Sequence, residues 1–190
     1  MASYPKKGVS TRATLAFLDE SGFSDRPLVR YTWGRRGHTP IIRSAGGWNR
    51  RTAIGTLLCT PQGTYPRFVF ALQRRGVRAP DCRRYLQKLK AYMRTRKLIL
   101  LWDGLPAHRA KIVQEWIYEN RAWLHVERFP AYDPEDNPAE YVWSSAKAKD
   151  MAHYLPKNMR ALERRIRRSF QRINRSKPLL KGCLRASGLY

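Results

Sequence analysis

Residues 97–109 have the sequence KLILLWDGLPAHR, and this stretch decides the fold class. The run Lys97–Trp102 is almost continuously apolar, as expected of a strand that is buried on both faces of a sheet. Asp103 ends the run, Gly104 bends the chain, and Pro106 suits the first turn of a following helix. A buried strand that leads directly into a helix is typical of a sheet covered by helices.

The rest of the chain predicts a block of strands followed by alternating helices and strands. The apolar pattern changes to helical spacing after Pro80. Short turns between the early strands favour antiparallel pairing. The sequence therefore predicts an α/β fold, a mixed sheet with antiparallel early strands and flanking helices. The expected strands are 13–18, 29–33, 51–59, 65–72, 97–102 and 123–129, and the expected helices are 82–93, 107–120, 138–151 and 157–175.

The composition is strongly basic. The 190 residues include 38 Lys and Arg against 14 Asp and Glu, which gives a formal charge of +24. A positive field of this size indicates a nucleic-acid backbone as the partner. Hydrophobic residues make up 43% of the chain, which argues against global disorder in spite of the charge. The length suits one domain, with or without a short appendage.

Several absences in the sequence predict the cellular setting. Cys59, Cys82 and Cys183 are far apart and match no metal-ligand spacing, so we expect reduced thiols. No apolar run approaches the roughly 18 residues that a membrane helix needs. The apolar stretch before Asp19 is too short for a signal peptide. We therefore expect a cytoplasmic, nucleoid-associated protein that contacts DNA or RNA and no membrane.

Three acidic residues stand where metal-dependent phosphoryl chemistry would need them. Asp19 and Asp103 each follow an apolar run, and ligand sites in open α/β sheets gather at the carboxyl ends of strands. Glu140 stands at the start of an expected helix, after Asn137. Carboxylates that share Mg²⁺ ions are suited to cutting a nucleic-acid backbone. These three residues are therefore the candidate catalytic and metal-binding set.

Each of these acids also has a structural explanation. Asp19 and Glu20 are both explained by a solvated turn, and at most one of them should face a given site. His108 is better explained as a satisfied imidazole than as a metal ligand. Asn137 and Glu140 form a capping-box-like arrangement, but a cap contributes only ~1 kcal/mol and many sequences would provide it. Three nearby acids are alternatives for the third ligand: Asp133, Glu135 and Asp136.

Basic residues gather in residues 157–190, which contain a single acid, Glu163. This imbalance is too large for salt bridges along a helix to absorb, so phosphate binding is favoured over a merely solvated face. A second basic cluster is expected to flank the active cleft. The residues expected to bind DNA are Arg164, Arg165, Arg167, Arg168, Arg172, Arg74 and Arg75. Burial is expected for three aromatic residues that might otherwise stack on bases: Tyr31, Trp33 and Trp48.

Three blocks of the sequence resemble a known family. They are LDESGF at 18–23, WDGLPAHR at 102–109 and YDPEDNPAEYVW at 132–143, with Lys147 one turn further on. Together they resemble the mariner-like bacterial insertion-sequence transposases, of the insertion sequence 630 type. That family belongs to the Asp-Asp-Glu (DDE) transposase and integrase superfamily. The resemblance spans about residues 13–155, and its third block is the most specific.

The resemblance implies a ribonuclease H-like fold and Mg²⁺-dependent DNA strand cleavage and strand transfer at insertion-sequence ends. The family's catalytic triad falls on Asp19, Asp103 and Glu140, which would hold two Mg²⁺ ions, with Mn²⁺ as a substitute. Gly104 departs from the Asn of many relatives but leaves the triad intact. Two alternatives remain open: a catalytically silent DNA-binding remnant of a transposase, and a structure-specific nuclease on the same fold.

The resemblance also implies partners and a domain organisation. DNA is expected as element ends and as target, and two element ends must be joined, which implies a homodimer in a synaptic complex. Only 18 residues precede Asp19, too few for the family's helix-turn-helix region. We therefore expect a catalytic half that works with a separately encoded helix-turn-helix half. The expected division is a basic lead-in (1–12), a catalytic domain (13–155) and a basic C-terminal helix and tail (156–190).

Overall fold

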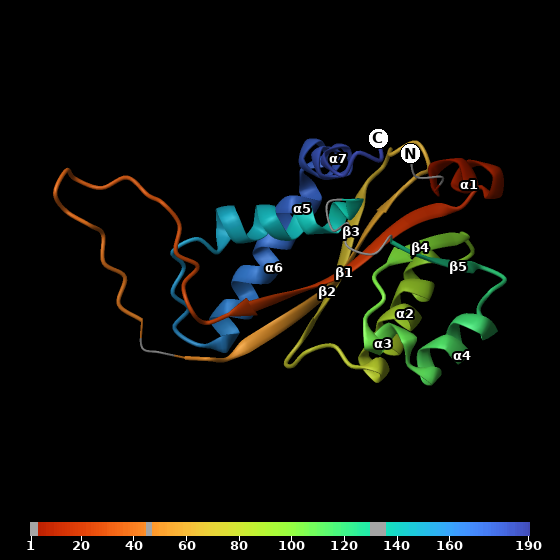
Figure 1. Ribbon diagram of the computed structural model, residues 1–190, viewed down its shortest axis with the longest axis horizontal. Coiled ribbons are helices and arrows are strands. Elements are labelled where there is room, and N and C mark those ends of the chain that lie inside the picture. The colour runs from red at the N-terminus through yellow and green to blue at the C-terminus, as the bar shows by residue number, and fades with distance from the viewer. Residues whose placement is uncertain (1–3, 45–46, 130–135) are drawn as a thin grey trace.

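The computed structural model describes residues 4–44, 47–129 and 136–190. Its centre is a five-stranded sheet in the order β3-β2-β1-β4-β5 (Figure 1). The central strand is antiparallel to β2 and parallel to β4, so the predicted mixed sheet with antiparallel early strands is confirmed. The strands are β1 (Thr14–Ser24), β2 (Arg50–Cys59), β3 (Arg67–Gln73), β4 (Leu98–Trp102) and β5 (Leu124–Arg128).

Helices cover both faces of this sheet. They are α1 (Tyr4–Thr11), α2 (Ala79–Met93), α3 (Pro106–Arg109), α4 (Lys111–Glu119), α5 (Pro138–Ser145), the π-helix η2 (Ala146–Asp150), α6 (Met159–Arg175) and α7 (Lys177–Ala186). In Figure 1, α5, α6 and α7 lie at the upper left, and α2, α3 and α4 at the lower right. Leu15 and Phe17 of β1 pack in the first of these layers, whereas Ala16 and Leu18 pack in the second. This alternation follows from the two-residue period of a strand.

Strand β1 extends beyond the end expected from the sequence. The stretch Asp19–Gly22 was predicted to be a loop, but it continues the strand because β2 pairs with it as far as Ser24. Asp19 therefore lies in the middle of β1, opposite Gly55. Because successive residues point to opposite faces, Asp19 faces the layer of α5 while Glu20 faces that of α3.

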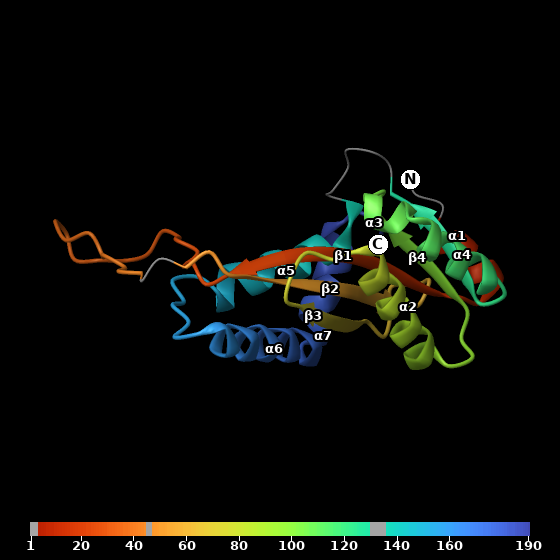
Figure 2. The same ribbon diagram turned by 90° about the horizontal axis from the view of Figure 1, so that it is seen from below.

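Residues 29–44 form a largely exposed segment that extends away from the sheet (Figures 1 and 2), whereas Leu28 before it forms a bridge with Ala152. The strand expected at 29–33 is not formed: residues 29–35 have no regular secondary structure, and their side chains are exposed. The predicted burial of aromatic residues is also wrong in this region. The exposed side chains are Tyr31, Trp33 and Trp48, and the relative exposure of Trp33 is 100%.

The single helix expected over 107–120 is divided into α3 and α4. Ala110 has the extended conformation (φ −61°, ψ 140°) that separates the two helices. The side-chain amide of Gln114 donates a hydrogen bond to the carbonyl oxygen of His108 at 2.6 Å, which satisfies an acceptor that a continuous helix would have used itself. Because of this break, α3 is a short helix of a single turn, and its His108 is buried.

Both ends of the chain are more ordered than the sequence predicted. The basic lead-in, for which no helix was expected, contains helix α1, and its Gly8 packs so closely on Pro61 that a Cβ there would lie 2.9 Å from Cγ. The tail after α6 contains helix α7, in which Leu180 and Leu184 join the same apolar cluster as β1. Among the described helices, none has the combination of length and apolar character needed to cross a bilayer.

Candidate active site

Asp19 is a buried carboxylate on the central strand. Its side chain is 9% exposed, and Oδ2 accepts a hydrogen bond of 2.7 Å from the indole Nε1 of Trp143 in α5. Burial, the neighbouring carboxylate of Glu140 and, to a smaller extent, that of Asp103 together raise the pKa of Asp19 to about 7, although hydrogen bonds from the backbone of Glu20 and from Trp143 act against them. Three acids from β1, α5 and the end of β4 thus act on one another electrostatically.

Asp103 follows the last residue of β4 and is held by two donors. Its Oδ1 lies 2.8 Å from Nδ1 of His108 and accepts a hydrogen bond of 3.1 Å from the backbone amide of Leu105. Burial by itself would raise the pKa of Asp103, but the hydrogen bonds from His108 and from the Leu105 amide, together with the charge of His108, outweigh it, and the pKa lies below its usual value. Asp103 is therefore fully ionised at neutral pH.

His108 is buried between two acids. Its side chain is 2% exposed, its ring stacks on Trp102 at 4.2 Å, and Nε2 lies 3.3 Å from Oε1 of Glu20. Burial would lower the pKa of His108, but the hydrogen bonds to Asp103 and Glu20 raise it to about 9. The imidazole is thus satisfied, as the sequence predicted, and it is a cation that links two carboxylates of the candidate site.

Glu140 occupies the third position of α5 and is exposed to solvent. Asn137 is the N-cap, as predicted, and its side-chain oxygen accepts a hydrogen bond of 3.1 Å from the amide of Ala139. Among the described residues, the Glu140 side chain takes no part in this cap. Capping therefore explains Asn137 but not Glu140, whose carboxylate instead raises the pKa of Asp19.

The candidate set suits a hard divalent cation by its donor chemistry. Oxygen ligands from carboxylates are those that Mg²⁺ and Mn²⁺ prefer, and the mutual repulsion that raises the pKa of Asp19 is what a cation would relieve. Within the described part of the chain, no three Asp, Glu, His or Cys side chains already stand in metal-binding positions. Of the alternative third ligands, Asp133 and Glu135 lie outside the described residues, whereas Asp136 lies directly before the N-cap of α5.

Sequence reasoning missed the partners of these acids. Trp143 and Glu20 were not recognised as contacts of the site, and His108 was not connected to Asp103. Strand periodicity could have placed Glu20 on the face opposite Asp19. The spacing of three residues between Glu140 and Trp143 could have placed both side chains on one side of a helix.

The basic residues of α6 fall into two groups. Arg164, Arg167 and Arg168 are exposed, and so is Arg165, although its Nε donates a hydrogen bond of 2.7 Å to the carbonyl oxygen of Asp150. Arg172 is half-buried and donates to the Asp150 carboxylate through Nη2 at 2.6 Å. Arg172 therefore connects α6 to η2 and is less available to a phosphate than its neighbours.

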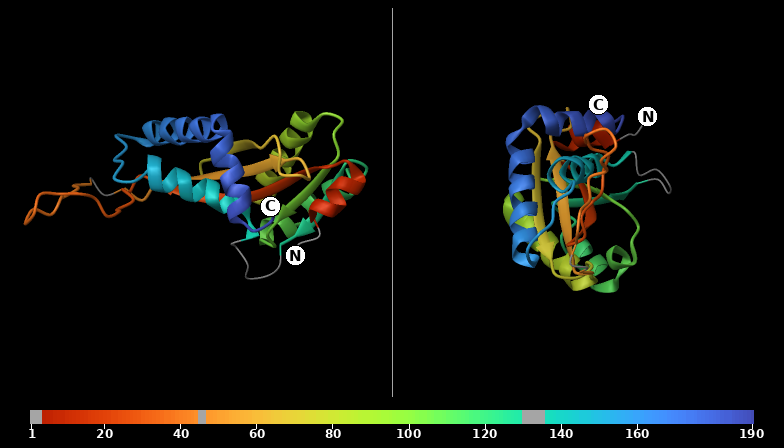
Figure 3. Two further views of the ribbon diagram at one scale, coloured as in Figure 1. Left: turned by 90° about the horizontal axis from the view of Figure 1, so that it is seen from above. Right: turned by 90° about the vertical axis from the view of Figure 1, so that its left-hand side faces the viewer.

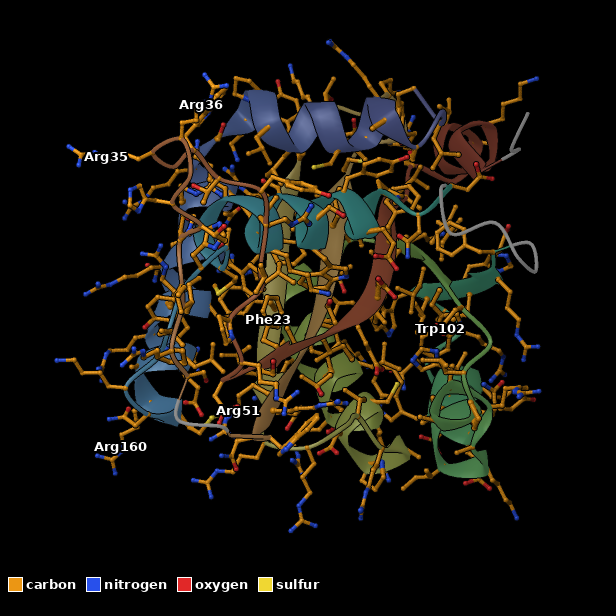
Figure 4. All side chains as sticks on the ribbon, turned by 60° about the vertical axis from the view of Figure 1, so that its left-hand side comes forward. Phe23, Arg35, Arg36, Arg51, Trp102 and Arg160 are labelled. Carbon is orange, nitrogen blue, oxygen red and sulfur yellow. The ribbon has the colours of Figure 1, made fainter. Side chains whose placement is uncertain are left out.

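Other cations project from loops and helix ends. Arg74 and Arg75 are exposed in the turn between β3 and α2. Figure 4 shows that Arg35, Arg36 and Arg160 point outward, away from the interior in which Phe23 and Trp102 lie. The positive charge is thus spread over several surfaces of the molecule.

A comparison with known protein families identifies the family to which the chain belongs. The sequence profile of the family described as DDE superfamily endonuclease matches residues 14–163. Because the match covers most of the sequence, the chain belongs to this family. No curated protein sequence matches it.

Solved structures of one transposase share its fold. The Mos1 transposase paired-end complex with left transposon end has a TM-score of 0.60 at 16% identity, covering 98% of this chain and 58% of that one. The Mos1 mariner paired-end complex with Mn has a TM-score of 0.60 at 17% identity, covering 98% and 59%. The catalytic domain of Mos1 mariner transposase has a TM-score of 0.52 at 15% identity, covering 98% and 87%.

These likenesses establish the architecture. The mixed sheet with its two helical layers, seen from two directions in Figure 3, is the ribonuclease H-like fold of the Mos1 catalytic domain, as the sequence predicted. The chain spans 58% of the length of the Mos1 transposase in the paired-end complex.

Proposed function

We propose that the chain is the catalytic part of a mariner-like bacterial transposase of the insertion sequence 630 type. In this proposal it cleaves DNA strands at the ends of an insertion sequence and joins them to target DNA, with a divalent cation as cofactor. The observation that carries the proposal is the placement of the three acids: Asp19 is buried on the central strand, Asp103 follows the end of the neighbouring strand β4, and Glu140 lies on α5, the helix whose Trp143 binds Asp19. Membership of the DDE endonuclease family supports it.

The three acids are proposed as the ligands of two Mg²⁺ or Mn²⁺ ions. When bound, two such ions activate a water or a 3′-hydroxyl and stabilise the leaving oxygen of an in-line displacement at phosphorus. Asp19 and Asp103 would hold one ion, and Glu140 would complete the second site. The imidazolium of His108 keeps Asp103 ionised and fixes the direction of its Oδ1. Solved Mos1 structures with Mg and with Mn support the choice of cation.

Further parts of the proposal concern organisation and partners. We propose that residues 13–155 form the catalytic domain and that residues 156–190 add a basic helical segment. DNA would be bound as element ends and as target, by a homodimer in a synaptic complex. A separately encoded helix-turn-helix half would supply recognition of the ends, and the protein would associate with the nucleoid. The paired-end complexes of Mos1 with transposon DNA support the choice of DNA as partner.

A cleavage and strand-transfer assay tests the proposal. The chain would be incubated with supercoiled plasmid, and separately with a labelled oligonucleotide that ends in a 3′-hydroxyl plus target plasmid, with Mg²⁺, Mn²⁺ or EDTA. We expect metal-dependent nicking and covalent joining of the oligonucleotide to the plasmid, both lost in Asp19→Asn. Nicking without joining would favour the structure-specific nuclease. DNA binding with neither activity would favour a silent remnant.

A further inference from the structure

We infer that Trp143 is a positioning residue for Asp19, and that Gly55 is the position that makes room for it. This inference rests on the proposed role of Asp19 as a metal ligand. Its first observation is the buried hydrogen bond of 2.7 Å from the indole Nε1 to Oδ2 of Asp19. The indole is 1% exposed, so no water competes for this donor, and the bond fixes one carboxylate oxygen in direction.

The chain holds the indole in place from several sides. Phe68 of β3 contacts the Trp143 ring edge-on, with 5.2 Å between the ring centroids. Phe170 of α6 contacts the same ring edge-on, with 5.5 Å between the centroids. Below the ring lies Gly55, and a Cβ at this position would approach Cη2 of the indole to 2.5 Å. That distance is too short for any side chain to be accommodated without moving the indole.

The register of the sheet explains why this glycine bears on the site. Gly55 of β2 is the direct partner of Asp19 in β1. Side chains of directly paired residues stand on the same face of a sheet, about 4.5–5.5 Å apart at Cβ. The indole therefore lies over the space that a side chain at position 55 would fill, and its N–H group reaches the neighbouring carboxylate.

The chemistry of indole suits this task. Indole is a donor only and stays neutral, so it orients a carboxylate without adding a positive charge that would compete with a metal ion. The backbone amide of Glu20 is a second neutral donor to the Asp19 carboxylate, so two groups without charge orient it. Glu140, one turn before Trp143 on α5, would approach the same centre from the same helix.

The test removes the donor and keeps the shape. Trp143 would be replaced by β-(3-benzothienyl)alanine, in which sulfur takes the place of the indole N–H, and in a second variant by Phe. Mn²⁺ affinity would be measured on the DNA-free protein by electron paramagnetic resonance. We expect Mn²⁺ to bind about 10-fold more weakly, at the lower end of the 10- to 100-fold loss that removal of a partner of a metal ligand causes.

The matched control is the same isosteric replacement at Trp123, whose Nε1 donates to the amide oxygen Oδ1 of Asn120 at 3.1 Å. This control should bind Mn²⁺ as the unmodified protein does. Gly55→Ala should weaken Mn²⁺ binding in the same direction as the Trp143 variants. Its circular dichroism would be recorded to show that the fold persists.

A second measurement reports on the bond itself. The indole proton resonance that disappears in Trp143→Phe identifies Trp143 among the six tryptophans. It should shift on addition of Mg²⁺, whereas the resonance of Trp123 should not. If metal-dependent cleavage is present but the benzothienyl variant binds Mn²⁺ normally and the Trp143 resonance ignores Mg²⁺, the positioning role is wrong while the proposed function stands. If the unmodified chain neither binds Mn²⁺ nor cleaves DNA, the proposed function itself fails.

Discussion

On one face of β1, Asp19 accepts a hydrogen bond from a neutral indole inside an apolar layer. On the other face, Glu20 contacts the buried imidazole of His108, which also binds Asp103 at the end of β4. The pKa of Asp19 is raised to about 7, mainly by burial, whereas His108 holds the pKa of Asp103 below its usual value. The pKa values of these two acids of one candidate centre are thus shifted in opposite directions.

The two acids therefore differ in how far their ionisation depends on a bound cation. Asp103 already has a positive partner, so its charge persists without metal. Asp19 has only neutral donors, the indole of Trp143 and the backbone amide of Glu20, so with a pKa of about 7 it carries a proton for part of the time at neutral pH until a cation arrives. Because a metal ligand must be deprotonated, we expect metal binding to release a proton from Asp19.

The largest effect should follow from removing any one ligand. Asp19→Asn, Asp103→Asn and Glu140→Gln should each lower metal-dependent cleavage by at least ~10³-fold, more than the 10- to 100-fold typical of outer partners. For Glu140→Gln the helix start should persist, because Asn137 provides the cap. Plasmid nicking together with thermal unfolding checks this. If Glu140→Gln keeps its activity, Asp136 or Glu135 becomes the third ligand.

The second effect concerns stability against pH without divalent metal. The folded-state pKa of Asp19, about 7, lies above the unfolded value of 3.8, so between these pH values only the folded state holds the proton. The contribution of Asp19 to stability should therefore be complete below pH 4, and up to about 4 kcal/mol of it should be lost as pH rises to 7. Urea unfolding in EDTA measures this slope, which Asp19→Asn should lack.

His108 should make the stability depend on pH over a second, higher pH range. Its folded-state pKa, about 9, lies above the usual 6.5, so its stabilising contribution is complete below pH 6.5 and lost as pH rises to 9. If the free energy of unfolding fell with the same slope between pH 4 and 7 in Asp19→Asn as in the unmodified chain, the raised pKa of Asp19 would be wrong. The contrast between the two faces of β1 would then be wrong as well.

The third effect comes from the imidazole itself. His108→Phe keeps an aromatic ring on Trp102 but removes both N–H donors, which leaves Asp103 and Glu20 without their cation. Cleavage should fall by about 10- to 100-fold, less than on loss of a ligand. Activity should be measured over a range of Mg²⁺ concentrations, because the loss should shrink as the ion is raised. Activity equal to that of the unmodified chain would mean that the pair does not position Asp103.

The smallest effect should come from cations remote from both faces. Neutralising Arg164, Arg165, Arg167 and Arg168 should weaken DNA binding alike for all sequences and flatten the salt dependence by up to one unit per phosphate contact. Arg172→Ala is the matched control: it breaks the pair with Asp150 and should lower stability with less change in the salt slope. Binding to an element end and to scrambled DNA at several salt concentrations decides this. A strong preference for the element end would place recognition within this chain.

The sequence predicted the elements whose pattern is local. The apolar run of β4 and the helical spacing of α2 and α6 each need only neighbours along the chain, and all three are confirmed. The end of β1 was placed too early, because pairing with β2 carries Ser21 and Gly22 through a stretch that looks like a turn. The strand expected at 29–33 is not formed for the converse reason: local β propensity counts only where a segment pairs, and the exposed residues 29–33 pair with none of the five strands.

The candidate site likewise contains residues that the sequence predicts and contacts that it does not predict. The three acids stand next to recognisable local patterns, so they could be nominated from sequence. Their partners are set by tertiary packing. The contact between Trp143 and Asp19 joins residues 124 positions apart, and that between His108 and Glu20 joins residues 88 positions apart. No local period encodes such pairs.

The packing of α7 has a consequence for how the protein is made. Leu180 and Leu184 complete the apolar cluster that contains Leu15 and Phe17 of the first strand. Contacts between such distant parts of a chain form late and slow the folding reaction. The core around Asp19 can therefore close only after α7 has been synthesised. We expect a chain still attached to the ribosome, with α7 not yet emerged, to be inactive toward the DNA from which its message is being copied.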